Sequence, residues 1–286
     1  MMEIVGDIVL PVSLAFIMYG MGLSLSVEDF KRVLRRRLPV TMGVISMMLI
    51  VPLVGVFFAV WFSPSPVLSV GIVLLATCPG GMLSNLMTDL VGGDLALSVS
   101  MTVVVSAVYV CIIPLIASGS VGYFLGDDSN IDFPMFNSFL KILTLTLVPV
   151  TFGMLTREKF RKFSEKARPI IKTLSTSFLV VAFSIIVFNQ MDVIRENFNN
   201  LILIVAALNV SAISIAYAIS KLGKLSKEET IAVCIEHSIR QEGTAMFIAV
   251  SLLNSYEMSI PMILNTLVGM VVCVTFILFF KRKKSF

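Results

Sequence analysis

Nine long apolar runs, separated by short charged segments, constrain the fold of this chain more than any other feature. The runs cover roughly residues 8–27, 39–62, 67–90, 95–118, 136–156, 169–190, 200–220, 230–253 and 260–280. Each run is long enough to cross the hydrocarbon core of a bilayer as a helix, which takes about 20 residues. The sequence therefore predicts an all-α polytopic membrane protein with nine transmembrane helices, forming one transporter-sized domain over residues 1–286.

Composition excludes several other classes of protein. Hydrophobic residues make up 57% of the 286 residues and charged residues only 14%, which is too apolar for a soluble, disordered or nucleic-acid-binding chain. The four cysteines all lie in apolar runs, without a CxxC pair or a Cys/His cluster, so no metal centre of that kind and no disulfide framework is indicated. We expect no organic cofactor, no nucleic acid and no obligate protein partner.

The distribution of basic residues predicts the orientation of the chain. Most of its 22 lysines and arginines fall in the segments 28–38, 157–168, 221–229 and 281–284, whereas the intervening connections are mainly acidic. Basic segments stay in the cytoplasm, where they also contact anionic lipid. We therefore expect an external N-terminus and a cytoplasmic C-terminus, and the compact connections are typical of a bacterial inner (plasma) membrane protein.

The run 230–253 carries an unusual polar cluster near its middle. Because one charge at the bilayer centre costs about 3 kcal/mol on insertion scales, these groups must face water, an ion or each other. In an intact helix Glu236 and Arg240 would share a face and could form a structural ion pair; the alternative is an ion or substrate site. The cluster consists of Glu236, His237, Arg240, Gln241 and Glu242.

The run 67–90 is interrupted by Pro79, Gly80 and Gly81, followed by Ser84 and Asn85. Proline alone would give a kink, but the added glycines favour an unwound break. Unwound backbone inside a membrane survives only within protein or beside a cavity. Its free carbonyl groups suit cations, and its free N–H groups suit anions.

Hydroxyl groups at Ser98 and Thr102 are spaced i, i+4 in the next run, where they could serve helix packing or act as ligands. Combined with Ser84, Asn85 and Glu236, they give a set of hard oxygen ligands with one negative charge. Such a set suits a small monovalent cation better than a transition metal.

The two polar-interrupted runs, 67–90 and 230–253, lie five spans apart. An odd offset places the two copies in opposite orientations, and inverted repeats with matching broken helices are typical of secondary transporters. The sequence therefore predicts a ten-helix inverted-repeat plan that lacks its first helix.

The stretch CPGGMLSNLMTDLVGGDLALSVSMT at 78–102 resembles the bile acid:sodium symporter family, and its bacterial members in particular. The resemblance implies two crossed discontinuous helices with sodium at the crossing and an organic anion beside it. It also implies a core, about 39–118 and 200–280, that moves against a panel, about 8–27 and 136–190.

The same resemblance implies roles for individual residues. Sodium would bind at Ser84, Asn85, Ser98, Thr102 and Glu236, and substrate at Met82, Leu83 and Gln241. Arg240 stands where the family often has a glutamine of a second sodium site, and the apolar Met47 stands at another position of that site. We therefore expect Arg240 to occupy or neutralise the second cation position. Glu242 departs from the family pattern.

The predicted function is sodium-coupled symport of an organic anion (bile-acid-like, pantoate-like or another carboxylate) by alternating access. Two alternatives on the same scaffold are sodium-independent or proton-coupled transport, with Glu236, His237 and Glu242 as proton-linked groups, and a sensor that does not transport. An intramembrane hydrolase would need Ser84 or Ser98 paired with His237, and the chain has no GxSxG motif.

Overall fold

The computed structural model describes residues 4–26, 28–29, 37–126 and 135–282, and within these ranges the chain is helical, without strands. The helices are η1 (Val5–Val9), α2 (Leu10–Gly22), α4 (Arg37–Ile45), η2 (Ser46–Ile50), α5 (Val51–Phe62), α6 (Pro66–Thr77), α7 (Met82–Leu90), α8 (Leu95–Leu125), α9 (Met135–Lys159), α10 (Arg161–Asn189), α11 (Met191–Leu222), α12 (Lys227–Ser238), α13 (Glu242–Phe247), η3 (Ile248–Leu252), η4 (Glu257–Ser259) and α14 (Ile260–Arg282).

Seven of the described helices are long and apolar enough to cross a membrane, or eight if the bent pair α6–α7 counts as one span. The segment from α12 to η3 covers the remaining apolar run, but it is broken and carries several charges. Large apolar side chains cover the outside of the bundle: Trp61 is 72% exposed and Phe188 is 81% exposed. Such a surface is suited to lipid, and the protein is a multi-pass membrane protein.

Several helices are longer than the apolar runs predicted. Helix α8 continues to Leu125, α10 begins at Arg161, and α11 begins at Met191. Hydropathy marks only the part of a helix that lies in hydrocarbon. Helix propagation continues through charged residues outside it, since each further residue adds a hydrogen bond to an existing nucleus.

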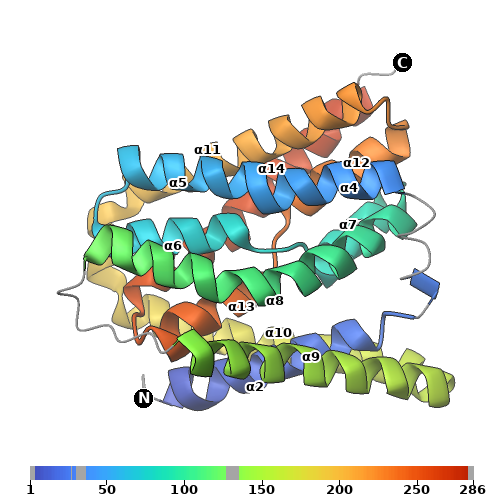
Figure 1. Ribbon diagram of the computed structural model, residues 1–286, viewed down its shortest axis with the longest axis horizontal. Helices are drawn as coiled ribbons and strands as arrows, with labels where there is room; N and C mark the ends of the chain where they lie inside the picture. Colours follow the sequence, from blue (N-terminus) through green and yellow to red (C-terminus); the bar gives the residue numbers. More distant parts are fainter. Residues whose placement is uncertain (1–3, 27, 30–36, 127–134, 283–286) are drawn as a thin grey trace.

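Helices α2, α9 and α10 pack together in one layer at the bottom of Figure 1, on one side of α6, α7 and α8. Helices α2 and α9 meet at Gly22 and Gly153. A Cβ atom on Gly153 would collide with the carbonyl oxygen of Tyr19 and with the backbone of Gly22. Small residues at this contact therefore allow the two backbones to touch, as in many membrane helix pairs.

The N-terminus and the C-terminus lie at opposite ends of the bundle (Figure 1). The turn between α9 and α10 and the turn between α11 and α12 lie at the same end as the C-terminus. These two turns carry basic residues, among them Lys159, Arg161, Lys221 and Lys224. Two of the basic segments of the sequence are thus gathered at one end of the fold.

Candidate functional site

The first element of the site is the break between α6 and α7. Helix α6 ends at Thr77, α7 begins at Met82, and the two axes differ by 52°. A Cβ atom on Gly80 would collide with the carboxylate of Glu236, and one on Gly81 would lie 3.0 Å from Oε1 of Gln241. The two glycines therefore allow the second broken segment to approach the backbone.

The second element is the break between α12 and α13. Helix α12 ends at Ser238, and α13 begins at Glu242. The backbone N–H of Gln241 donates to the carbonyl oxygen of Pro79 over 2.8 Å. The two breaks, which are more than 150 residues apart in sequence, thus meet at one point.

A group of oxygen atoms surrounds the carboxylate of Glu236 next to this point. Oxygen Oε1 of Glu236 accepts hydrogen bonds from the hydroxyls of Ser84 (2.7 Å), Ser98 (2.6 Å) and Thr102 (3.0 Å). The amide oxygen Oδ1 of Asn85 lies 2.8 Å from the Ser98 hydroxyl and 3.4 Å from that of Thr102. The structure thus brings together all five side chains that the sequence suggests as sodium ligands.

This oxygen group contains more acceptors than protons. Each hydroxyl has one proton. The Ser84 hydroxyl has two acceptors within reach, Glu236 and the carbonyl of Gly81, and the Ser98 hydroxyl also has two, Glu236 and Asn85. The other carboxylate oxygen of Glu236 is buried without a hydrogen-bond partner. A cation would stabilise this group, because it would pair with the buried carboxylate and with the oxygen lone pairs that no proton reaches.

The donor set fits a sodium ion. The side chains of Ser84, Ser98, Thr102 and Glu236 are fully buried, so water is excluded from most of the group. One carboxylate with neutral oxygens is a hard ligand set of single negative charge. Within the described residues, no cluster of three or more His, Cys, Asp or Glu side chains suits a transition metal.

Arg240 does not form the ion pair with Glu236 that an intact helix would have allowed. The helix ends at Ser238, so the i, i+4 geometry between the two residues is lost. Atom Nη1 of Arg240 donates instead to the carbonyl oxygens of Ala76 (2.7 Å) and Leu75 (3.4 Å), at the C-terminal end of α6. The guanidinium group thus neutralises the negative end of a broken helix.

The proposed substrate-contacting residues lie where the breaks face α2. The amide Nε2 of Gln241 lies 3.8 Å from the sulfur of Met18, and the sulfur of Met82 lies 3.9 Å from the Ser24 hydroxyl. Sulfur is a weak acceptor, so a better acceptor could displace either contact. Leu83 lies in the first turn of α7 and is 40% exposed.

Glu242, which departs from the family pattern and is a proton-linked group in one of the alternatives above, belongs to a second polar chain. Its Oε1 accepts from Nδ2 of Asn265 (2.7 Å), and Oδ1 of Asn265 accepts from Nδ2 of Asn209 (2.6 Å). Both asparagines are buried. Sequence reasoning missed them, although single amides within apolar runs are the signal that could have found them.

His237 is held away from the oxygen group. Its Nδ1 lies 2.7 Å from the carbonyl oxygen of Val233, and its Nε2 lies 2.7 Å from the hydroxyl of Ser46. Because a carbonyl only accepts, Nδ1 donates to Val233, and the one proton of the Ser46 hydroxyl is shared between Nε2 and the carbonyl oxygen of Gly43, 2.9 Å away. This arrangement suits a packing role that joins α12 to η2.

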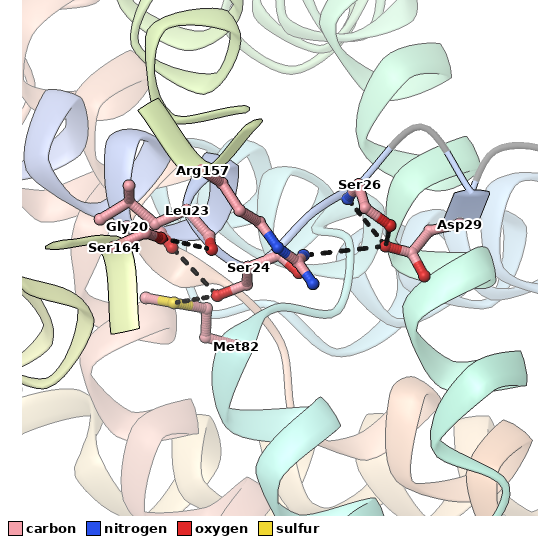
Figure 2. A network of polar contacts seen from close by, with 8 residues as sticks. All are labelled: Gly20, Leu23, Ser24, Ser26, Asp29, Met82, Arg157 and Ser164. Carbon is pink, nitrogen blue, oxygen red and sulfur yellow. Dashed lines mark hydrogen bonds and ion pairs between the residues drawn. The ribbon is translucent and has the colours of Figure 1, made fainter. Parts of the chain in front are cut away.

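Figure 2 shows a further polar network, where the chain that follows α2 meets α7 and α9. Arg157 donates to the carbonyl oxygen of Ser24 and lies 4.0 Å from the carboxylate of Asp29. The backbone N–H and the hydroxyl of Ser26 donate to the same carboxylate (2.8 and 2.7 Å). Arg157 thus fixes the segment whose Ser24 touches Met82, a link between distant helices that no sequence pattern indicates.

The comparisons with known proteins all point to one family of sodium-dependent transporters. The family model described as Sodium Bile acid symporter family matches residues 11–197, which include the first break but not the second. Among similar proteins, the probable sodium/metabolite cotransporter BASS2, chloroplastic, of Oryza sativa subsp. japonica is 29% identical over 83% of this chain and 55% of its own length. The uncharacterized sodium-dependent transporter YocS of Bacillus subtilis (strain 168) is 28% identical over 82% of this chain and 72% of its own length.

The ileal sodium/bile acid cotransporter of Homo sapiens is 28% identical over 65% of this chain and 52% of its own length. The chain thus spans about half the length of the rice and human relatives. All three relatives are named as transporters and not as enzymes. Because the family model covers well over half of the residues, the chain belongs to the sodium bile acid symporter family.

Proposed function

We propose that this protein is a sodium-coupled symporter of an organic anion that works by alternating access. The observation that carries the proposal is the buried oxygen group around Glu236, in which Ser84, Ser98 and Thr102 all direct hydroxyls at one carboxylate oxygen. A sodium ion at this position would draw α7, α8 and α12 together. Relatives whose names describe sodium-dependent transport support the same reading.

Coupling follows from the position of the oxygen group beside the breaks. Ser84 lies in the first turn of α7, and its hydroxyl contacts both the Glu236 carboxylate and the backbone of Gly81. A sodium ion that orders Ser84 would also order the free N–H groups at Met82 and Leu83, which can bind an anion. By linkage, the anion must then tighten sodium binding by the same factor.

Arg240 would act as a permanent substitute for a second sodium ion. Its guanidinium group contacts the carbonyl oxygens at the end of α6, where a broken helix presents a negative dipole end. Arginine keeps its charge under all ordinary conditions. The expected stoichiometry is therefore one sodium ion per cycle.

The wider architecture of the proposal is an inverted repeat of nine spans, in a ten-helix plan without its first helix. The layer of α2, α9 and α10 would be the panel, and the remaining helices the core that moves against it. The gathering of basic turns at the end that holds the C-terminus supports a cytoplasmic C-terminus and an external N-terminus. We place the protein in a plasma membrane, and propose a bacterial one.

A thermal stability measurement on the purified protein in detergent tests the sodium site. Sodium should raise the melting temperature relative to potassium at equal ionic strength, and Glu236→Gln should remove the difference. Glu228→Gln, on the exposed side of the same helix α12, is the matched control and should keep it. Full sodium stabilisation of Glu236→Gln would contradict the proposal.

Proton coupling is the second candidate, and Glu242 is the observation that favours it. Its carboxylate sits at the start of α13 beside the crossing and heads a chain of buried amides. Uptake into proteoliposomes that rises with an inward proton gradient, is indifferent to sodium, and is lost in Glu242→Gln would support this candidate over the first.

A further inference from the structure

A groove of about 560 Å³ lies between helix α9 and the chain that follows α2, at the end of the bundle that holds the C-terminus. Leu25 and Glu28 line it on one side. Thr151, Leu155 and Glu158 line it on the other, and their spacing of four and three residues places them on one face of α9. All three are exposed, so the groove opens to the surroundings of the protein.

The lining of the groove changes from apolar to charged along α9. Leu155 belongs to its apolar part, whereas Arg157, Glu158 and Arg161 form its charged end. The lining of α9 from Thr151 to Glu158 spans about 10 Å, at the helical rise per residue. The headgroup region of a bilayer is roughly 5–7 Å deep on each side of the hydrocarbon core. The groove therefore has the length and the polarity of a phospholipid in the leaflet at this end of the protein.

The charged end of the groove offers both signs of charge. Arg157 and Arg161 can bind a phosphate through paired N–H groups, and Glu28 and Glu158 can accept hydrogen bonds from an ammonium group. A headgroup with a phosphate and a primary ammonium complements both signs. An anionic headgroup of the glycerol type would leave the carboxylates without a cation. The quaternary ammonium of a choline headgroup has no proton to donate to them.

The contacts that the two arginines already make leave them able to bind a phosphate. Arg161 pairs with Glu165 over 3.3 Å, but both side chains are largely exposed, and such a pair contributes little. Arg157 lies 4.0 Å from the Asp29 carboxylate, which is longer than a hydrogen bond (Figure 2). Arg168 is close enough to repel Arg157, so a further negative charge would be stabilised there.

We propose that this groove binds one phospholipid that carries a phosphate and a primary ammonium, which is the chemistry of phosphatidylethanolamine. The phosphate contacts Arg157 and Arg161, and the ammonium group contacts Glu158. The first part of an acyl chain lies against Leu25 and Leu155. Lipid binding here does not depend on what the protein transports, so the proposal stands or falls apart from the proposed function.

The position of this lipid connects it to the first break. Arg157 donates to the carbonyl oxygen of Ser24, and the hydroxyl of Ser24 lies 3.9 Å from the sulfur of Met82, in the first turn of α7 (Figure 2). A phosphate that draws Arg157 away from Asp29 changes the restraint on this segment. The lipid is thus placed to act on the contact between α7 and the chain that follows α2.

Lipid titrations of the full-length protein in detergent test the site. Phosphatidylethanolamine, phosphatidylglycerol and phosphatidylcholine with identical acyl chains are added separately in mixed micelles. The melting temperature is recorded against lipid concentration, and native mass spectrometry counts the lipids retained. Phosphatidylethanolamine should bind about fivefold more tightly than the other two, since it gains one exposed ion pair, and one molecule should be retained. Equal stabilisation by the three lipids would overturn the proposal.

Replacement of Glu158 tests the contact with the ammonium group. Glu158 is exposed, so Glu158→Gln should fold, and it should lose the preference for phosphatidylethanolamine over phosphatidylglycerol. Glu228→Gln is the matched control, because Glu228 is an exposed carboxylate in the first turn of α12, outside the groove, and it should keep the preference. A preference that survives in Glu158→Gln would overturn the proposal.

Replacement of Arg157 tests the contact with the phosphate. Arg157→Gln should reduce the lipid-dependent rise in melting temperature for phosphatidylethanolamine and phosphatidylglycerol alike, because both carry the phosphate. The rise is the readout, since loss of the bond to the Ser24 carbonyl lowers the melting temperature even without lipid. Lys162→Gln, an exposed basic residue of α10 outside the groove, should leave the rise unchanged. An undiminished rise in Arg157→Gln would also overturn the proposal.

Discussion

The backbone N–H of Gln241 donates to the carbonyl oxygen of Pro79 over 2.8 Å, and this hydrogen bond joins the two broken segments of the protein. Each residue lies in a break, where the helix has left a backbone group without its usual partner. The two breaks therefore satisfy each other. The oxygen group around Glu236 adjoins this bond, since a Cβ atom on Gly80, the residue after Pro79, would collide with the Glu236 carboxylate.

Gly80 is the position at which the oxygen group is most sensitive to added volume. In Gly80→Ala, the new methyl group would occupy the space of the Glu236 carboxylate. We expect the apparent affinity for sodium, measured by sodium-dependent thermal stabilisation, to fall by more than tenfold. Gly122→Ala is the control, since a Cβ atom there meets nothing within 4 Å, and alanine favours helix α8. Unchanged sodium affinity in Gly80→Ala would place the ion elsewhere.

Two serines in α8 give a matched pair for the ligand set. Ser98 and Ser100 are both buried, but Ser98 donates towards Glu236, whereas Ser100 donates to the carbonyl oxygen of Ala96 in its own helix. Ser98→Ala should weaken sodium binding about tenfold, because a hydrogen bond to a charged group contributes about 1.5–3 kcal/mol. Ser100→Ala should leave it unchanged. Sodium titrations of the melting temperature compare the two, and equal effects would refute a ligand role for Ser98.

Replacement of Arg240 tests the internal substitute for a second cation. Arg240→Gln removes the fixed charge at the carbonyl oxygens of Leu75 and Ala76 and supplies an amide oxygen in its place. We expect the number of sodium ions bound to rise from one to two, seen as a steeper sodium dependence of stability. Arg240→Lys, which keeps a positive charge, should stay at one. A stoichiometry that does not change in Arg240→Gln would show that Arg240 replaces no ion.

Asn265 is expected to be a stability determinant, because it connects two other buried groups. Asn265→Ala leaves the Glu242 carboxylate without its side-chain donor, whereas the Asn209 amide keeps its hydrogen bond to the carbonyl oxygen of Val205. One unpaired buried group costs about 1–3 kcal/mol, so the melting temperature should fall by about 5 °C. Asn189→Ala, at the exposed end of α10, is the control and should have little effect. A melting temperature equal to that of the control would mean that the amide chain contributes no stability.

The sequence predicted the parts of this fold that depend on solvent. The charged segments between the apolar runs marked the ends of the helices, because the free-energy cost of a charge in hydrocarbon is high whatever the tertiary structure. Pro79, Gly80 and Gly81 marked a break because proline lacks an N–H and glycine permits unwound backbone. The structure also brings together the five residues that were proposed as sodium ligands, although their binding of sodium stays a prediction.

Features that depend on contacts between distant helices could not be predicted. The ion pair of Glu236 and Arg240, one of the two alternatives that the sequence left open, does not form, since the i, i+4 spacing holds only in an intact helix and the second break lies between the two residues. Glu242 found its partner in Asn265, on another helix.

The close contact of Gly22 and Gly153 has a mechanical consequence. Because the two backbones touch without side chains between them, α2 and α9 would move together as one rigid unit in the proposed transport cycle. In the proposed movement of the panel against the core, sliding would take place where α2 and α9 face α8, at a cavity of about 110 Å³ that Met18 and Met21 help to line.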